Sequence, residues 1–526
     1  MPLQTQNMST EIQISLLPEH LDNETEILRC ISQQLGVAEN RIKHIALRKR
    51  SVDARKRTAV FYQLRYEVWI DEEPTNEVAF QLPLQDVSLK KEIYIVGLGP
   101  AGLFAALKCI ELGYKPIVLE RGKDVRARRR DLAALNKEGI VNPDSNYCFG
   151  EGGAGTFSDG KLYTRSTKRG DTAAVLNVLH YFGATADITI DAHPHIGTNK
   201  LPQIIQNMRE KIVECGGEVR FETKLTNIFI QHNKIAQIEI NGNEKINTDT
   251  LILATGHSAR DIFELLHKNN ILIEAKPFAL GLRVEHPQAL IDSLQYHCQV
   301  RHPNLPAASY SLVKQVLNKG VYSFCMCPGG IICPSTTEEN GLVVNGWSPS
   351  KRDSPFANSG IVVEVQVEDF ISKNPSPLDG LLFQRKVEEK AAWAGGGKQV
   401  APAARLSDFV AGKVSNTLPE CSYLPGLHAT DLRNVLPSFV YKRLQEGFRQ
   451  FGQALKGYVS AEAVVVGVES RTSSPVRIPR DIETLMHPQV QGLFPCGEGA
   501  GYAGGIMSAA IDGQKCAVAV VRFLAN

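Results

Sequence analysis

The sequence predicts an α/β fold in which one parallel sheet is assembled from two separated parts of the chain. An α+β domain is inserted between these parts, and a small α+β domain precedes them. Residues 93–122, IYIVGLGPAGLFAALKCIELGYKPIVLERG, indicate strand, glycine turn, helix and strand. Residues 492–526 again indicate strand, glycine-rich turn and helix. With 526 residues the chain exceeds what one hydrophobic core normally supports, so several domains are expected.

Changes in texture divide the chain into four segments. We predict an N-terminal α+β domain (1–88), the first part of the parallel-sheet domain (89–276), an inserted α+β substrate domain (277–468) and the closing part of the parallel-sheet domain (469–526). In the first segment TEIQISLL and TAVFYQLRYEVWI are β-prone, and NETEILRCISQQLGV has helical periodicity. The inserted segment mixes strands, Pro/Gly-rich loops and a helical stretch, PLDGLLFQRKVEEKAAW.

Composition narrows the class of protein. Apolar residues make up 43% of the chain and charged residues 22%, and the net charge of +2 implies no overall attraction to nucleic acid or membrane. No apolar run reaches the roughly 18 residues of a membrane span. The first residues, MPLQTQNMSTEIQ, lack the basic-then-apolar pattern of a secretory signal. We therefore expect a cytoplasmic protein, with its eleven cysteines as free thiols and no membrane partner.

Three glycines follow the first predicted strand of the parallel sheet. Gly97, Gly99 and Gly102 form G-x-G-x-x-G between a strand and a helix, the pattern of a Rossmann-like turn. The turn lets a pyrophosphate approach the backbone at the positive end of the helix. Glu120, at the end of the next strand, would accept hydrogen bonds from ribose hydroxyls. The alternative is a tight strand–helix turn without a ligand.

The C-terminal segment distinguishes between nucleotides. In GLFPCGEGAGYAGGI a strand ends near Glu498, an acid that could bond a ribityl chain or phosphate. Gly504 and Gly505 would let the backbone pass close to a flavin ring, and a helix beginning near Ile506 would direct its positive end at that ring. This closing segment predicts FAD. The alternative is a C-terminal helix with a glycine-rich cap.

Two further segments are compatible with the same cofactor. Residues 254–256, ATG, end a buried strand where a glycine could pass the dinucleotide. Residues 150–162, GEGGAGTFSDGKL, form a glycine-rich loop with hydroxyls at Thr156 and Ser158 and a cation at Lys161. The alternative for this loop is an ordinary surface loop.

Several strings together resemble a known family. GxGPAG…ER, FGEGGAGTFSDGKL, ATGHSARD, FCMCPGG, FANSGIVVEV and GEGAGYAGGIMSAAIDG are similar to those of bacterial FAD-dependent dehydrogenases usually labelled uncharacterised, within the glutathione-reductase-like flavoprotein superfamily. The resemblance runs from residue 93 to the C-terminus, and the family typically has a small N-terminal α+β domain. It implies a redox flavoprotein without a settled substrate. The resemblance implies FAD contacts at Gly97, Gly99, Gly102, Glu120, Arg121, Thr156, Ser158, Gly256, Glu498 and Gly505.

The complete predicted FAD-binding set adds neighbours of these residues. The added residues are Pro100, Ala101, Gly155, Lys161, Leu225, Ala254, Thr255, Gly497, Gly504 and Ile506.

The sequence also lacks two features of pyridine-nucleotide disulfide reductases. It has no second strand-flanked G-x-G-x-x-G and no C-x-x-C or C-x4-C pair near the first one. NAD(P)H would therefore be a transient donor, or hydride would come from the substrate itself. We predict an FAD-dependent oxidoreductase (dehydrogenase) that transfers hydride between flavin N5 and an unidentified small-molecule substrate or NAD(P)H.

No catalytic residue is fixed by the sequence, although four weak candidates emerge. CMCPGGIIC contains Cys325 and Cys327, which would share one face of a strand and could both point at the flavin. The C-x-C spacing is poor for zinc, so no metal site is predicted, and buried, inert thiols are the alternative to redox work. His257, directly after ATG, could carry a proton or simply cap the turn. Arg471 could lie beside the ring, bind a substrate carboxylate or form a loop salt bridge.

The string GLRVEH contains a further polar row. Arg283, Glu285 and His286 could orient an anionic substrate, although strand alternation predicts a surface row equally well.

A basic segment near the N-terminus supports a second function class. Residues 41–65 contain nine Lys or Arg against a single acid, Asp53, and a second basic run, RGKDVRARRRD, follows Glu120. A solvated charged face is the plainer interpretation. The alternative is an RNA surface, with Phe61 and Tyr62 available for stacking, which would make the protein a flavin-dependent tRNA-modifying enzyme. A non-enzymatic flavin-binding regulator is a third possibility.

Overall fold

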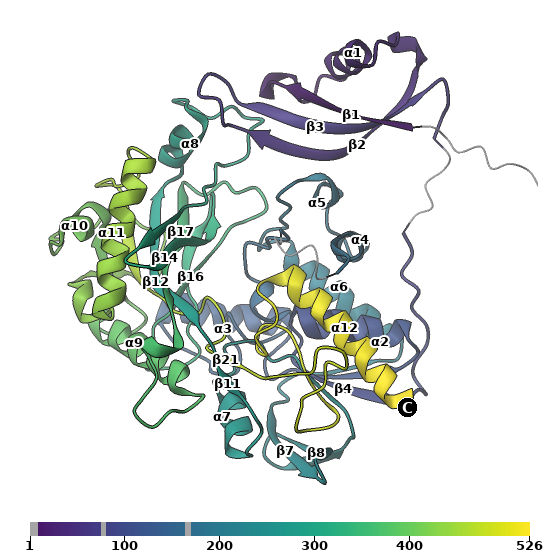
Figure 1. Cartoon of the computed structure of the whole chain (residues 1–526), viewed down its shortest axis with the longest axis vertical. Coiled ribbons are helices and arrows are strands. Elements are labelled where there is room, and N and C mark those ends of the chain that lie inside the picture. The colour runs from purple at the N-terminus through teal and green to yellow at the C-terminus, as the bar shows by residue number, and fades with distance from the viewer. Residues whose placement is uncertain (1–8, 75–79, 164–169, 526) are drawn as a thin grey trace, which may run out of the picture.

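The computed structural model of the chain describes residues 9–74, 80–163 and 170–525 (Figure 1). A five-stranded parallel sheet and a seven-stranded mixed sheet form two large bodies, and a three-stranded sheet lies at the top of the view. None of the helices in these ranges combines the length and apolar character needed to cross a bilayer.

The parallel sheet combines strands from both ends of the chain that follows the N-terminal domain. Its order is β22-β10-β4-β5-β6. The strands are β4 (Glu92–Val96), β5 (Lys115–Leu119), β6 (Glu218–Arg220), β10 (Leu251–Leu253) and β22 (Leu493–Pro495). All neighbouring pairs are parallel, and β4 is buried apart from its first residue, as expected at the centre of such a sheet. The predicted α/β fold with a discontinuous Rossmann-like domain is confirmed.

Most helices of this domain cover one face of this sheet, and a meander together with the helix at Arg260–Lys268 covers the other. On the helical face α12 crosses α2 so closely that a Cβ on Gly513 would lie 2.0 Å from the Ala101 carbonyl oxygen. The helices of this domain are α2 (Pro100–Glu111), α3 (Val125–Glu138), α4 (Thr172–Tyr181), α5 (Asp187–Ile190), α6 (Leu201–Glu214), α7 (Arg260–Lys268) and α12 (Ile506–Ala525). The meander consists of β7 (Leu225–Gln231), β8 (Lys234–Ile240) and β9 (Glu244–Asn247).

The inserted domain is built on the seven-stranded sheet, in the order β13-β14-β17-β12-β20-β18-β19. Its strands are β12 (Phe278–Pro287), β13 (Val313–Val316), β14 (Lys319–Cys327), β17 (Phe356–Val365), β18 (Ala401–Arg405), β19 (Leu427–Ala429) and β20 (Val464–Glu469). A separate hairpin pairs β15 (Ile331–Pro334) with β16 (Val344–Trp347). The helices are α8 (Gln288–Tyr296), α9 (Asp379–Gly395), α10 (Leu406–Ala411) and α11 (Ser438–Ala454).

The sequence prediction missed helix α11. Its buried Val440, Leu444 and Phe448 are spaced as on one helical face and pack into the core of the inserted domain. Gly447 and Gly452 weaken the helical signal of the segment. Packing against the sheet compensates for that weak propensity.

A short two-stranded sheet lies where the chain passes between the two large bodies. There β11 (Glu274–Ala275) pairs antiparallel with β21 (Val476–Arg477). The outgoing and returning connections therefore run side by side.

The N-terminal domain is a three-stranded antiparallel sheet with one helix. The sheet has the order β1-β3-β2, from β1 (Ser9–Leu16), β2 (Ile42–Asp53) and β3 (Phe61–Ile70), and α1 (Glu24–Leu35) packs on it. It contacts both large bodies. Tyr62 donates a hydrogen bond to the Asn304 carbonyl at 2.5 Å, and Arg50 forms a 2.7 Å ion pair with Asp191.

Candidate functional site

A cavity opens at the carboxyl ends of β4, β10 and β22, the edge where parallel sheets of this type present ligands. Every residue predicted to bind the cofactor lines it except Gly102, Thr156 and Gly504. Two of the weak catalytic candidates, His257 and Cys325, line it as well. Lining residues that were not predicted are Val96, Leu119, Cys148, Phe149, Gly153, Ala154, Asp159, Gly160, Thr223, Ser258 and Ala509.

Two glycines of the strand–helix turn are required by packing within the protein. Gly97 has φ +100°, and a Cβ there would lie 2.4 Å from the Ala254 carbonyl oxygen. A Cβ on Gly102 would lie 1.9 Å from the Gly97 carbonyl oxygen. These positions shape the turn and the close packing of helix on sheet. Gly102 faces the Gly97 carbonyl rather than the cavity, and it does not line the cavity.

Three other glycines leave open space that the protein itself does not fill. Among the residues that the structure describes, the nearest atom to a Cβ on Gly99 is 3.9 Å away, and a Cβ on Gly256 or Gly505 would have none within 4 Å. All three line the cavity. Room of this kind along the turn, the end of β10 and the approach to α12 fits a dinucleotide that passes close to the backbone.

The turn also directs a helix N-terminus at the cavity. Gly99 is the N-cap of α2, no side chain caps this end, and Pro100 occupies the first turn. The first N–H groups of a helix have no intrahelical partners and carry partial positive charge. The cavity-lining residues Gly99, Pro100 and Ala101 therefore suit a pyrophosphate.

Glu120 is buried and connects the turn to the glycine-rich loop. Its carboxylate accepts hydrogen bonds from the N–H groups of Leu98 at 2.8 Å, Gly122 at 2.9 Å and Gly150 at 2.9 Å. It also lines the cavity. Besides its predicted contact with ribose, Glu120 therefore fixes the backbone on both sides of the cavity.

Arg121 follows Glu120 and brings a positive charge to this end of the cavity. Arg121 lines the cavity, pairs with Asp261 at 2.7 Å and stacks over the Phe149 ring, 4.5 Å from its centroid. Its position is therefore held from two sides.

The glycine-rich loop is organised by Arg128, whose role sequence reasoning missed. Its fully buried guanidinium donates hydrogen bonds to the carbonyl oxygens of Asn146, Tyr147, Glu151 and Gly153 at 2.8–3.0 Å, and to the Thr156 hydroxyl at 3.3 Å. Burial lowers the pKa of Arg128 to about 10. The basic run RGKDVRARRRD was interpreted as a solvated face, whereas this member lies inside the protein. An arginine at helical spacing from buried Val125 and Leu132 was the available signal.

The two hydroxyls predicted on this loop differ in their surroundings. Thr156 is buried, and its hydroxyl donates to the Glu151 carbonyl at 2.6 Å, so it is used within the loop. Ser158 lines the cavity and donates to the Gly155 carbonyl at 2.7 Å.

The C-terminal turn brings Glu498 next to His257. Glu498 accepts a hydrogen bond from the Gly505 N–H, and its carboxylate lies 3.6 Å from His257 Nε2. Burial lowers the pKa of His257, although Glu498 opposes that shift. The His257 imidazole lines the cavity, and α12 begins at Ile506 as the sequence predicts. Gly504 instead donates to the Ser508 hydroxyl at 2.9 Å outside the lining.

The two remaining catalytic candidates do not line the cavity. Cys327 is fully buried behind Cys325. Arg471 is 6% exposed and forms a bidentate ion pair with buried Glu388, at 2.9 and 3.2 Å. Glu388 also pairs with Arg260 at 2.8 Å. The arrangement matches the alternative of a salt-bridged loop arginine.

The row Arg283, Glu285 and His286 is neither a surface row nor part of the cavity lining. All three are at most 1% exposed. Arg283 pairs with Glu469 at 2.6 Å, Glu285 accepts from the Ser422 N–H at 2.7 Å, and His286 Nε2 lies 2.8 Å from the Tyr458 carbonyl oxygen. Strand alternation failed because β12 is the central strand of a sheet that is covered on both faces.

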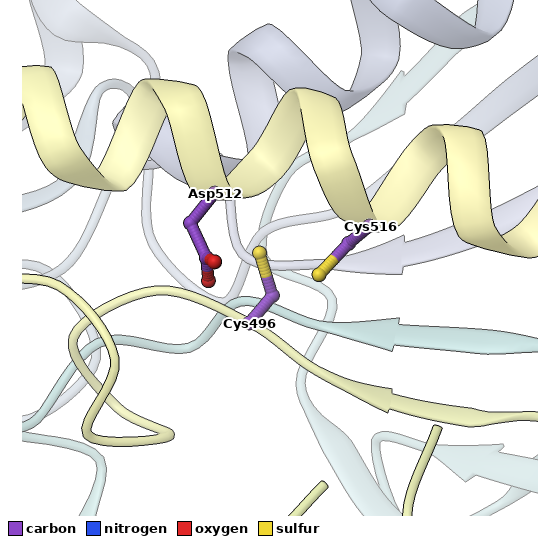
Figure 2. Close-up of side chains that lie close together, drawn as sticks. All are labelled: Cys496, Asp512 and Cys516. Atoms are coloured by element: carbon purple, nitrogen blue, oxygen red, sulfur yellow. The ribbon is translucent and has the colours of Figure 1, made fainter. Parts of the chain in front are cut away.

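Figure 2 shows a buried group beneath the C-terminal turn that the sequence did not indicate. Asp512 and Cys516 of α12 point toward Cys496, and their ligand atoms lie within 4.8 Å of one another. Arg480 donates to Asp512 at 2.6 and 3.0 Å, and the Gly497 N–H donates to the same carboxylate at 2.8 Å. A guanidinium thus already balances the carboxylate, and the group fastens the end of β22 to α12.

Two family models match parts of the chain. Residues 277–472 match "FAD-dependent protein, C-terminal domain-like", and residues 8–69 match a domain of unknown function (DUF8436). A protein of Clostridium beijerinckii, described as "Uncharacterized protein", is 42% identical over 530 residues, which cover 97% of this chain and 98% of the relative.

Similar solved structures are much more distant. A flavoprotein/dehydrogenase from Cytophaga hutchinsonii is 13% identical, with 82% of this chain and 79% of that chain covered and a TM-score of 0.37. CtdE in complex with FAD is 12% identical, with 83% and 85% covered and a TM-score of 0.32. Similarity this remote supports no conclusion about activity. The predicted family and cofactor are confirmed: the chain belongs to the same family as the Clostridium protein, its inserted domain matches the C-terminal domain of FAD-dependent proteins, and its cofactor is FAD.

Proposed function

We propose that the protein is an FAD-dependent oxidoreductase that transfers hydride between the flavin and a small molecule, with NAD(P)H as a transient donor. The observation that carries the proposal is one cavity that joins a dinucleotide turn to polar and thiol groups from other segments. Bound FAD would supply the hydride chemistry at flavin N5.

The chain's own residues supply binding and orientation. The open sides of Gly99, Gly256 and Gly505 would admit the dinucleotide, and the N-terminus of α2 would bind its pyrophosphate. The N-terminus of α12 opens onto the same cavity at Ile506 and favours negative charge there. His257 is within ion-pair distance of Glu498 and could hold a proton at Nε2.

The RNA-modifying alternative has weaker support. Many of the basic side chains around β2 have acidic partners: Arg41 pairs with Asp71, Arg48 with Glu67, Arg50 with Asp187 and Asp191, Arg55 with Asp53, and Arg65 with Glu11. Pairing of this kind reduces the charge available to a phosphate backbone. We therefore keep a small molecule as the proposed substrate.

The test is anaerobic stopped-flow mixing of the purified FAD-loaded protein with NADH and with NADPH, followed by a screen of acceptors. We expect one nicotinamide to bleach the flavin absorbance and an acceptor to restore it. If no donor bleaches the flavin and no substrate does so directly, the oxidoreductase proposal is wrong and a flavin-binding regulator is favoured. Steep salt-dependent tRNA binding would instead favour the RNA-modifying enzyme.

A further inference from the structure

The end of β14 distorts so that one of its two cysteines reaches the cavity. The register between β14 and β17 shifts between Phe324 and Cys327, and Cys325 has φ +46°. Left-handed backbone at a residue other than glycine is costly, and such strain is concentrated at functional sites. The bulge leaves Cys325 in the cavity lining and Cys327 fully buried behind it.

Cationic groups surround the two thiols. Lys161, which also lines the cavity, donates to the Met326 carbonyl, and its Nζ lies 3.9 Å from Cys327 Sγ. Arg283 donates to the Cys325 carbonyl at 2.7 Å, and its Nη2 lies 3.8 Å from Cys327 Sγ. The acids that face this group are Asp159, 3.8 Å from Lys161, and Glu469, 2.6 Å from Arg283. Both cations lie within 4 Å of Cys327 Sγ, and they also lower the pKa of Cys325, so a thiolate on either cysteine of the pair would be favoured.

Accessibility distinguishes the two cysteines, because Cys325 lines the cavity whereas Cys327 is fully buried. Hydrogen bonding from the Cys327 thiol lowers the pKa of Cys325, burial opposes this shift, and the Lys161 and Arg283 cations add to it. The same hydrogen bond and burial raise the pKa of Cys327. An accessible, more acidic thiol next to a buried, less acidic one is the asymmetry expected of an attacking and a resolving cysteine.

We propose that Cys325 and Cys327 form a redox-active dithiol that reduces a disulfide substrate, with Cys325 as the attacking thiol and Cys327 as the resolving thiol. The inference rests on the proposed function, which supplies the electrons, and it goes beyond that function by naming the substrate class. The C-x-C spacing of this pair differs from the C-x-x-C and C-x4-C pairs of pyridine-nucleotide disulfide reductases.

The steps balance in atoms and electrons. The Cys325 thiolate attacks one sulfur of a substrate R–S–S–R, which breaks that bond, forms a mixed disulfide and releases one thiolate. Cys327 then attacks Cys325 Sγ, so that the Cys325–Cys327 disulfide forms and the second thiolate leaves. The two protons lost by the cysteines are taken up by the two product thiols. Bound FAD, once reduced by NAD(P)H with one proton, would supply the two electrons and two protons that reopen the Cys325–Cys327 disulfide.

The first test measures the thiols directly and does not require FAD. The protein is oxidised with diamide, its remaining thiols are blocked with N-ethylmaleimide under denaturing conditions, and the peptide that contains Cys325, Cys327 and Cys333 is analysed by mass spectrometry. We expect a disulfide between the first two cysteines in wild-type protein and in the matched control Cys333→Ala. It should be absent in Cys325→Ser and Cys327→Ser. Three blocked cysteines in oxidised wild-type protein would overturn the inference.

The second test counts electrons in the FAD-loaded protein. Anaerobic dithionite titration after oxidation should consume four reducing equivalents per FAD in wild type and in Cys333→Ala. It should consume two in Cys325→Ser, or in Cys325→Ala if the serine variant folds poorly. In Cys325→Ser and in Cys327→Ser, the rate at which NAD(P)H reduces the probe disulfide dithiobis(nitrobenzoate) should fall to the rate measured without protein.

The outcomes separate this inference from the proposed function. If NAD(P)H bleaches the FAD but wild type consumes only two equivalents and both cysteines remain reduced, the dithiol inference is wrong and the oxidoreductase proposal stands. If FAD is not reduced by any donor, both proposals fail.

Discussion

The parallel-sheet domain and the inserted domain contribute to the same cavity, yet their residues reveal their roles in different ways. In the parallel-sheet domain Gly97, Gly99 and Gly102 form one G-x-G-x-x-G turn, and the spacing of this motif indicates their roles before any contact is known. In the inserted domain and its junction, Arg283 and Arg471 are charged groups whose partners, Glu469 and Glu388, come from distant parts of the chain. Spacing along the sequence reveals the first kind of role, whereas the second depends on tertiary contacts.

The largest expected effect distinguishes the glycines that pack against the protein, Gly97 and Gly102, from those whose open side faces the cavity, such as Gly99. Gly97→Ala would place a Cβ 2.4 Å from the Ala254 carbonyl oxygen at a backbone position with φ +100°. We expect a loss of more than about 3 kcal/mol in the free energy of unfolding, measured by urea denaturation, because neither β10 nor the turn can move without disrupting the sheet. A variant as stable as wild type would show that the turn relaxes freely, and the distinction between the two kinds of glycine would be lost.

The second prediction tests the charged junction in the same units. Arg471→Met removes one cationic partner of Glu388, which is fully buried and also contacts Arg260. We expect a loss of about 2–3 kcal/mol in the free energy of unfolding, because the buried carboxylate loses Arg471 but keeps Arg260. The double variant Arg471→Met/Glu388→Gln should recover part of that loss. If it recovers none, Arg471 acts through something other than Glu388.

The third prediction concerns the arginine that the sequence did not reveal. Arg128→Lys keeps the charge but provides a compact ammonium where five acceptors surround a planar guanidinium. We expect a loss of about 1–3 kcal/mol in the free energy of unfolding, together with weaker FAD binding, since the glycine-rich loop loses hydrogen-bond donors. Arg129→Lys is the matched control, because Arg129 is an exposed arginine on the same helix. FAD affinity equal to wild type would show that the loop is organised without Arg128.

The sequence alone could predict the α/β fold, the discontinuous sheet and most of the residues that line the cavity. Those residues are glycines at backbone turns and short segments at strand ends, so local pattern carries the information. The sequence could not predict that Arg128 lies inside the glycine-rich loop or that Cys325 and Cys327 face different surroundings. The burial of Arg128 depends on carbonyls brought together by folding, and the exposure of Cys325 depends on a bulge that the alternation rule does not anticipate.

The fourth prediction uses the pH dependence of stability to test the ion pairs of Glu388 with Arg260 and Arg471. Arg260 and Arg471 hold the pKa of Glu388 at about 2 although its burial acts in the opposite direction. The pKa of a glutamate in the unfolded chain is about 4.3, so the pKa of Glu388 is lower in the folded state. Its stabilising contribution is therefore present above about pH 4.3 and is lost as pH falls toward the folded value. The stability difference between wild type and Glu388→Gln should narrow over this range in urea unfolding curves. A constant difference would exclude Glu388 as the titrating group.

The smallest expected effect on stability is also the most direct test of the cofactor site. Gly99 has φ −74°, and a Cβ there would lie 3.9 Å from the nearest protein atom, so Gly99→Asp should change the free energy of unfolding of the FAD-free protein by less than about 0.5 kcal/mol. The new carboxylate would nevertheless meet the pyrophosphate at the N-terminus of α2, so the purified variant should lack flavin absorbance. Gly99→Asn is the matched control, because its side chain has nearly the same size without the negative charge, so it should retain more flavin than Gly99→Asp. A fully yellow Gly99→Asp protein would show that FAD does not approach this turn. The roles assigned to the open glycines would then have to be given up, while the packing roles of Gly97 and Gly102 would remain.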